Sequence, residues 1–330
     1  MKRWICVLLC ACLIFGMTAC SSEGSLSEND SAGNPDILEG STGSSNVQQE
    51  QESEGDEAQV QGVYDYETTE INCSIGDQNI YGVAYIPETD EKVPLVIFSH
   101  ELGNTHRSGT EYAEELASRG IATYTFDFRG GSTASRSDGS TVGMSVMTEA
   151  ADVEAVLDAA KEWDFVDIDR IALIGASQGG MASAVAASRR PDEIAGLILL
   201  YPALLVHDAV HEQFDSLDEV PAQFYFNGWI NVGKNYVSDV WDYDVYAEMP
   251  NYTNLVLILH GDRDGIVDVS YAQRAAESYP DAELHILHGA GHGFYSSSFD
   301  VAMDYILDYL REIGFLGQND YRLFLCKKYP

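Results

Sequence analysis

The chain has 330 residues, 45% of them hydrophobic and 22% charged, and its 53 Asp and Glu against 18 Lys and Arg give a formal net charge of −35. Proteins that bind nucleic acids, or anionic lipid headgroups through a surface patch, need clustered cations, so this balance argues against both classes. Six cysteines in a chain of this length do not indicate a disulfide scaffold. The composition is that of an acidic globular protein, either an enzyme or a ligand-binding module.

The first twenty residues resemble a bacterial lipoprotein signal. Lys2 and Arg3 precede an apolar run, residues 4–17, and Cys20 follows the tripeptide Met-Thr-Ala. This run is shorter than the ~20 residues that span a bilayer, but it suits the core of a signal peptide. We therefore expect cleavage after residues 1–19 and a lipid on Cys20, which gives an extracytoplasmic protein anchored to the bacterial cell membrane. The alternative is an ordinary secretory signal cut near the same position.

Residues 20–61 predict a disordered acidic tether. From residue 21 to 61 there are ten acids, no Lys or Arg, and no aromatic residue. Such a segment cannot bury enough apolar surface to offset the entropy lost on ordering. The folded domain is expected over residues 62–330. Its cysteines, Cys73 and Cys326, could form a disulfide outside the cell or remain free.

Beyond the tether, apolar segments of two kinds alternate. Short runs rich in β-branched and aromatic residues predict strands, whereas apolar residues at helical spacing, such as Val153, Val156 and Leu157, predict helices. Strands are expected at residues 80–86, 94–99, 121–126, 171–174, 197–201, 255–259 and 283–287, and helices at 112–119, 148–163, 178–188, 270–279 and 299–313. This alternation predicts an α/β fold, with a mostly parallel sheet flanked by helices on both faces.

Residues 203–250 interrupt the alternation and predict a small lid inserted over the carboxyl edge of the sheet. Their aromatic density suits an apolar or aromatic ligand, with packing of the lid on the body as the simpler alternative. The aromatic residues are Phe214, Phe224, Tyr225, Phe226, Trp229, Tyr236, Trp241, Tyr243 and Tyr246.

The pentapeptide Gly175-Ala176-Ser177-Gln178-Gly179 fits the pattern G-x-S-x-G between an expected strand and an expected helix. Glycines on both sides allow the sharp turn that lifts a serine hydroxyl clear of the sheet. The N-terminus of the following helix favours developing negative charge. We predict that Ser177 is a nucleophile; the alternative is a turn with only a packing role.

A serine nucleophile needs an acid to orient its base, and residues 260–267 supply the candidates. Asp264 is our choice, because the pattern H-G-x-x-D-x-x-V places it where the chain turns back over a strand end. Asp262 is the next candidate, and Asp268 follows. The acidic tract from residue 262 to 268 lacks the loop spacing of an EF-hand calcium site, and we predict no metal.

The base is expected after the last predicted strand. His292 lies in a glycine-flanked loop, which gives the chain order Ser…Asp…His. His288 stands at the strand end and is expected to be structural, and His260 is expected to have a turn or packing role.

An oxyanion hole requires two backbone amides. The amide of Gln178 directly follows the serine. The second is expected from the loop at residues 99–104, where we favour the amide of Leu102.

Residues 73–313 look like the α/β-hydrolase fold, and more narrowly they resemble bacterial feruloyl and cinnamoyl esterases and related acyl hydrolases. The likeness is carried by residues 99–104, 126–130, 175–180 and 260–264. The resemblance implies that the triad and oxyanion roles fall on Ser177, Asp264, His292, Leu102 and Gln178. One departure is Glu101, because the family usually has glycine after the histidine of this loop. A carboxylate there would oppose the oxyanion if it pointed inward.

The expected activity is hydrolysis of carboxylic esters, with feruloyl, cinnamoyl or acyl-carbohydrate esters as candidate substrates. Ser177 would attack the carbonyl, and water would then release the acyl group, without a cofactor. An anionic body favours neutral small-molecule esters over phosphates. No nucleic acid and no obligate protein partner are expected. The alternatives are a serine peptidase of the prolyl-oligopeptidase type and a non-catalytic surface-binding lipoprotein.

Overall fold

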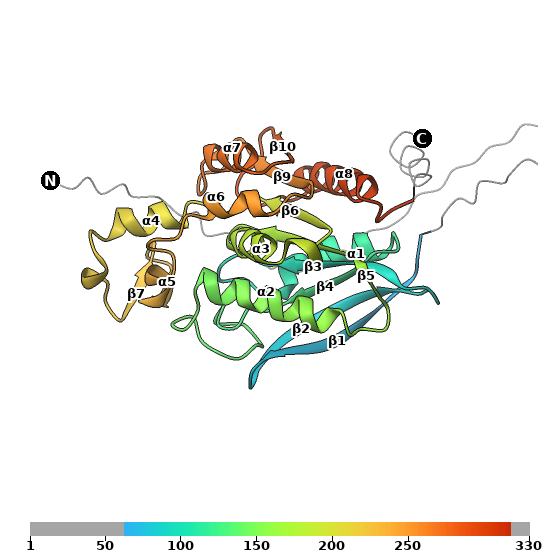
Figure 1. The fold of residues 1–330 in the computed structure, drawn as a ribbon, viewed down its shortest axis with the longest axis horizontal. Coiled ribbons are helices and arrows are strands. Elements are labelled where there is room, and N and C mark those ends of the chain that lie inside the picture. Colours follow the sequence, from blue (N-terminus) through green and yellow to red (C-terminus); the bar gives the residue numbers. More distant parts are fainter. Residues whose placement is uncertain (1–62, 318–330) are drawn as a thin grey trace, which may run out of the picture. The chain divides into compact units, whose positions relative to one another are not determined.

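Residues 63–317, described by a computed structural model, contain an eight-stranded sheet with the order β1-β2-β4-β3-β5-β6-β9-β10 (Figure 1). Its strands are β1 (Tyr66–Ile75), β2 (Gln78–Pro87), β3 (Val93–Ser99), β4 (Ala122–Phe126), β5 (Val166–Ala176), β6 (Gly196–Leu200), β9 (Val256–Gly261) and β10 (Ala282–Leu287). β1 pairs with β2, and β2 with β4, in antiparallel register. The remaining pairs are parallel, as the alternation of elements predicts.

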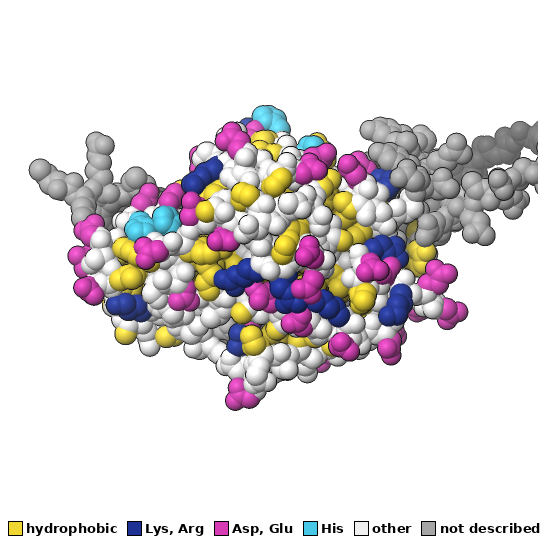
Figure 2. All heavy atoms as spheres, in the orientation of Figure 1, with side chains coloured by type: hydrophobic (Ala, Val, Ile, Leu, Met, Phe, Trp, Pro, Cys, Tyr) yellow, Lys and Arg dark blue, Asp and Glu magenta, His cyan; other side chains and the backbone are white. Residues whose placement is uncertain are grey.

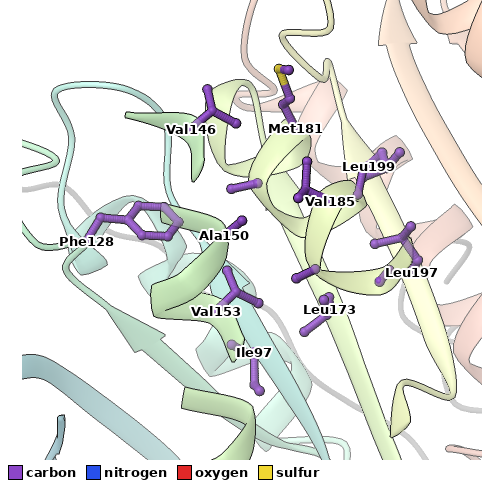
Figure 3. Packing of buried hydrophobic residues seen from close by; sticks show 14 of the residues in the cluster. Ile97, Phe128, Val146, Ala150, Val153, Leu173, Met181, Val185, Leu197 and Leu199 are labelled. Carbon is purple, nitrogen blue, oxygen red and sulfur yellow. The ribbon is translucent and has the colours of Figure 1, made fainter. Parts of the chain in front are cut away.

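Helices cover both faces of the sheet because successive residues of each buried strand point to opposite sides. Leu95 and Ile97 pack on one side with residues of α2 and α3, in the cluster that Figure 3 shows around Ile97. Val96 and Phe98 pack on the other side with residues of α1 and α8. The helices are α1 (Thr110–Ala117), α2 (Val146–Ala160), α3 (Gln178–Arg189), α7 (Val269–Ser278) and α8 (Ser297–Glu312). Each large apolar side chain buried in these layers contributes about 1.5–3 kcal/mol.

All the expected strands and helices are present, with ends that differ by up to five residues, but β1 was not expected. It lies at the sheet edge, and most of its side chains are exposed, among them Glu67 and Glu70. This strand therefore lacks the apolar pattern that reveals the buried ones. Gly76, at φ +60°, supports the turn that folds β1 onto β2.

Within residues 203–250 lie a separate two-stranded hairpin, formed by β7 (Gln223–Phe226) and β8 (Ile230–Gly233), and three α-helices. The helices are α4 (Val206–Gln213), α5 (Asn235–Ser238) and α6 (Val245–Glu248). Hydrogen bonds tie this segment to the residues that lead into α2. Thr141 Oγ1 donates to the carbonyl of Asn231 (2.6 Å), and Ser145 Oγ donates to Asp239 Oδ2 (2.6 Å). The same Ser145 hydroxyl caps α2 by accepting from the Thr148 amide. The extent of the lid remains a prediction.

The predicted signal, Cys20, the tether and Cys326 lie outside the described residues. Cys73 is buried with its Sγ 3.5 Å from the Tyr124 hydroxyl, and it forms no disulfide within residues 63–317. A search of the same residues finds no helix with the length and apolarity that crossing a membrane requires.

Candidate active site

Ser177 occupies the turn between β5 and α3 in a backbone conformation that non-glycine residues rarely adopt, at φ +51°. The flanking glycines are required by close approach. A Cβ on Gly179 would lie 2.3 Å from the carbonyl oxygen of Ser99, and one on Gly175 would lie 2.5 Å from the carbonyl oxygen of Gly179. The serine is fixed by its own backbone, because its amide donates to Leu200 and its carbonyl accepts from Ala203.

The structure brings Ser177, His292 and Asp264 together from the carboxyl ends of three strands. His292 Nε2 lies 2.9 Å from Ser177 Oγ, and His292 Nδ1 lies 2.8 Å from Asp264 Oδ2. These residues follow β5, β10 and β9, whose parallel carboxyl ends meet at one edge of the sheet. The histidine is therefore placed between a hydroxyl and a carboxylate.

Asp264 is held on both carboxylate oxygens. Oδ1 accepts from the amides of Ile266 (2.8 Å) and Val267 (2.9 Å), while Oδ2 faces His292 and lies 3.3 Å from His260 Nε2. Burial alone would raise the pKa of Asp264, but hydrogen bonds from His260, His292 and the Val267 amide outweigh it and hold that pKa well below its usual range. The side chain is thus a carboxylate that can stabilise an imidazolium.

The other two candidate aspartates have different partners. Asp262 Oδ2 lies 2.5 Å from His288 Nδ1, and Oδ1 accepts from the Gly289 amide. Asp268 caps α7 by accepting from the Ser270 amide. Neither carboxylate is bonded to His292, and in residues 63–317 no three His, Cys, Asp or Glu side chains are grouped to hold a metal ion.

His260 has a closer link to the site than its expected turn or packing role implied. Its buried Nε2 lies 2.9 Å from the Val267 carbonyl and 3.3 Å from Asp264 Oδ2. Two acceptors around one nitrogen mean that Nε2 carries the proton. No local sequence signal distinguishes this histidine from a turn residue; the contact exists because the chain after β9 folds back over it.

The loop after β3 orients the peptide that contains the Leu102 amide. The carbonyl of Glu101 accepts from His100 Nδ1 (2.7 Å) and from the Asn104 amide (3.1 Å), and His100 Nε2 accepts from the Phe128 amide (3.1 Å). Burial lowers the pKa of His100, which favours this neutral form. Because the C=O and N–H of a trans peptide point in opposite directions, the Leu102 N–H points away from His100. None of the hydrogen bonds within residues 63–317 uses it.

Gln178 is the first residue of α3, so its amide has no acceptor within the helix. Its buried side chain is held at both ends: Nε2 donates to Glu149 Oε2 (2.9 Å), and Oε1 accepts from the Tyr236 hydroxyl (2.6 Å). Burial raises the pKa of Glu149 to about 8. A buried polar chain therefore connects α2, the residue after the serine, and α5.

Glu101 is turned toward neutral hydrogen-bond donors. Oε1 accepts from the Tyr201 hydroxyl (2.9 Å) and Oε2 from the Asn104 amide group (3.1 Å). Tyr201 is buried at φ +38°, and its ring meets the ring of His292 edge to face with centroids 4.9 Å apart. The departure from the family pattern thus produces a contact between the loop at residues 99–104 and Tyr201, whose ring packs on His292.

Trp229, on the hairpin within residues 203–250, packs against Gly103 of the loop at residues 99–104. A Cβ on Gly103 would lie 2.8 Å from its ring, and the indole is 51% exposed. Phe226 and Tyr236 are buried and pack on each other, whereas Tyr225 is exposed. A cavity of about 690 Å³ lies between the loop after β10 and the start of α8, and its lining includes His292 and Tyr295.

These groups can perform nucleophilic acyl chemistry. A histidine between a hydroxyl and a carboxylate can remove the hydroxyl proton as the oxygen attacks, and two unpaired amides at the same strand ends can stabilise an oxyanion. The mostly parallel sheet with helices on both faces, and the serine on a strained strand-to-helix turn, define an α/β-hydrolase.

The chain belongs to the prolyl oligopeptidase family, whose profile matches residues 110–313. Among solved structures it is similar to Est1E from Butyrivibrio proteoclasticus, determined with ferulic acid bound, at 25% identity and a TM-score of 0.66, over 73% of this chain and 99% of that one. An esterase from Exiguobacterium antarcticum, 18% identical, has a TM-score of 0.56 over 74% of this chain and 99% of its own. Acetyl xylan esterase 1 from Thermoanaerobacterium sp. JW/SL YS485, 18% identical, has a TM-score of 0.54 over 74% and 84%.

The two esterases at 18% identity establish the fold alone. No curated protein matches the sequence. Family and fold together make the protein a hydrolase.

Proposed function

We propose that this protein is a serine esterase that hydrolyses carboxylic esters through an acyl-enzyme on Ser177. The observation that carries the proposal is the position of His292, 2.9 Å from the serine hydroxyl and 2.8 Å from a carboxylate whose pKa is lowered. Esters are favoured over other acyl substrates by the likeness to Est1E, which was determined with ferulic acid bound.

In the proposed mechanism Ser177 Oγ attacks the ester carbonyl while His292 Nε2 takes its proton. Asp264 stabilises the imidazolium, and the amides of Leu102 and Gln178 donate to the oxyanion. His292 then protonates the leaving alcohol. Water attacks the acyl-enzyme by the reverse of these proton transfers, which releases the acid and restores the serine.

We further propose aromatic or short acyl groups, such as feruloyl, cinnamoyl or acetyl, esterified to a carbohydrate alcohol. The half-exposed Trp229 beside Gly103 supports an acyl site with an aromatic wall, because aromatic groups gain from offset or edge-to-face contact. Two other aromatic residues of this segment, Phe226 and Tyr236, are buried and pack on each other, which holds the hairpin in place.

The family match favours a second candidate, a serine peptidase, because the same nucleophile and base can cleave an amide. The leaving group of an amide is an amine, and it depends more on protonation by His292 than the alkoxide that leaves from an ester. Comparison of an ester and an amide with the same acyl group distinguishes the two activities.

The test is a panel of acetyl, butyryl, long-chain and feruloyl esters, with a chromogenic dipeptide, assayed with the mature protein and its Ser177→Ala variant. We expect ester hydrolysis to exceed peptide cleavage, and the variant to lose about 10⁴-fold or more in kcat. Full ester hydrolysis by Ser177→Ala would contradict the mechanism. Faster cleavage of the dipeptide would establish the peptidase, and failure of a fluorophosphonate to label Ser177 would favour a binding protein.

A further inference from the structure

We infer that Glu101 is a specificity-determining residue that disfavours acyl groups carrying a negative charge. The inference rests on the proposed acyl transfer at Ser177 and adds the class of ester that the site selects. It starts from the one residue at which the Leu102 loop departs from the pattern of the esterases that it resembles.

The position of the Glu101 carboxylate is fixed within the active site. Both oxygens accept hydrogen bonds, one from Tyr201 and one from Asn104, so the side chain is held against the site instead of extending into solvent. The residue directly precedes Leu102, and the ring of its partner Tyr201 packs against the ring of His292. The carboxylate is thus connected to the proposed oxyanion donor through the backbone and to the base through a phenol.

The charge of this carboxylate is not compensated by a cation. Its two partners are a phenol and an amide, and none of the ion pairs among residues 63–317 includes Glu101. Burial, and next the charge of Glu101, raise the pKa of Tyr201 well above its ordinary value, so the phenol stays a donor. The negative charge therefore remains in the site.

An acyl chain with its own carboxylate would bring a second negative charge into this partly buried region. Like charges several ångströms apart repel strongly where the effective dielectric constant is about 20, and water and salt screen them only in part. Neutral esters avoid this repulsion. We expect Glu101 to reduce kcat/KM for an anionic ester by roughly tenfold relative to a neutral ester of the same shape, the factor that about 1.4 kcal/mol produces.

The experiment compares two 4-nitrophenyl esters of adipic acid, one with the far carboxyl group free and one with it methylated. The full mature protein is assayed as wild type and as Glu101→Gln, which keeps an oxygen for the Tyr201 hydroxyl but removes the charge. Glu67→Gln is the matched control, because it removes the same charge from an exposed position on the edge strand β1. The midpoint of thermal unfolding verifies that each variant is folded. If Glu101→Gln is not folded, Glu101→Ala is used in its place.

We expect the ratio of kcat/KM for the neutral ester to that for the anionic ester to fall about tenfold in Glu101→Gln, through faster turnover of the anionic ester, and to be unchanged in Glu67→Gln. An unchanged ratio in a folded Glu101→Gln enzyme overturns the inference, and so does an equal fall in both variants. In that case only the inference fails. The proposed function is tested separately, and it is still supported if wild type hydrolyses the neutral ester and Ser177→Ala does not.

A second measurement does not depend on ester turnover. Labelling rates of Ser177 are compared for two fluorophosphonates, one with a neutral tail and one with a carboxylate at its end. Preference for the neutral probe in wild type, reduced in Glu101→Gln, supports the inference. Equal preference in both proteins contradicts the inference, whereas no labelling of Ser177 by either probe contradicts the proposed function on which it rests.

Discussion

Four polar groups hold the carboxylate of Asp264, and they separate it from the two aspartates nearby in the sequence. Two backbone amides fix one oxygen, and two imidazoles face the other. Asp262, by contrast, pairs with His288, whose side chain is 90% exposed. An exposed pair of this kind contributes little to stability, because water screens the two charges.

Replacement of Asp264 by Asn is predicted to lower kcat for a short 4-nitrophenyl ester by about 10³–10⁴-fold. The amide removes the charge that stabilises the imidazolium and can hold the imidazole in the wrong tautomer. Asp262→Asn is the matched control, and its kcat is expected to stay within about twofold of wild type, since its side-chain partners are His288 and the Gly289 amide and not His292. The opposite ranking of the two variants would assign the acid to Asp262.

A chain of buried hydrogen bonds joins the helices α2, α3 and α5 through Glu149, Gln178 and Tyr236. Ser145 caps the N-terminus of α2, one turn before Glu149, and its hydroxyl donates a hydrogen bond to Asp239, the residue directly after α5. The residue that follows the proposed nucleophile is therefore supported from two sides by buried hydrogen bonds. Loss of either partner would leave a buried polar group unpaired, which costs about 1–3 kcal/mol.

Burial of Glu149 makes stability depend on pH. Its pKa is about 8 in the folded protein, against about 4.3 in an unfolded chain. Because the folded state binds this proton more tightly, the corresponding stability is fully present below about pH 4.3 and is lost as the pH rises toward 8. Asp152, on the same helix, has a pKa raised by burial to about 6 and acts in the same direction over a narrower range.

Glu149→Gln cannot titrate, and its amide oxygen can still accept from Gln178. We predict that its free energy of unfolding, relative to wild type, increases between pH 5 and pH 8 by on the order of 3 kcal/mol. Urea denaturation at the two pH values measures this difference. Glu154→Gln, a change at a solvent-accessible position on the same helix, should leave the pH dependence unaltered. Identical pH dependence in Glu149→Gln and wild type would show that Glu149 is not the titrating group.

For the whole molecule, the decisive property is its charge. Acidic side chains are scattered over the face shown in Figure 2, mixed with fewer Lys and Arg. A chain with a formal net charge of −35 is repelled by anionic membrane surfaces, so electrostatic attraction cannot hold it there. We propose that the protein is attached to the membrane through the lipid that the sequence predicts on Cys20.

We therefore predict that Cys20→Ala abolishes palmitate labelling in the native cell and moves the protein from the membrane fraction to the soluble fraction. Ser21→Ala, next to the modified position, is the control and should keep the label. Labelling that persists in Cys20→Ala would show that the predicted signal is an ordinary secretory one or that another residue carries the lipid.

Much of the fold was predictable because its signals are local. The buried strands are continuous apolar runs, the covering helices repeat apolar residues at helical spacing, and the glycines around Ser177 reveal a turn that other residues would block. The edge strand β1 escaped prediction because its exposed side chains carry no such pattern. Nothing in the local sequence distinguishes His100, directly after β3, or His260, in β9, from other histidines at strand ends, because their contacts form only when the chain folds back on itself.

The sequence by itself predicted the mostly parallel α/β architecture, the sharp turn at Ser177, and Ser177, Asp264 and His292 as candidate residues in that chain order. Only the tertiary structure decided which aspartate meets His292, where the carboxylate of Glu101 points, and that Gln178 is held by Glu149 and Tyr236. The physical reason is separation along the chain. Backbone conformation follows from neighbouring residues, whereas His292 and Ser177, 115 positions apart, meet only because the sheet places the ends of their strands at one edge.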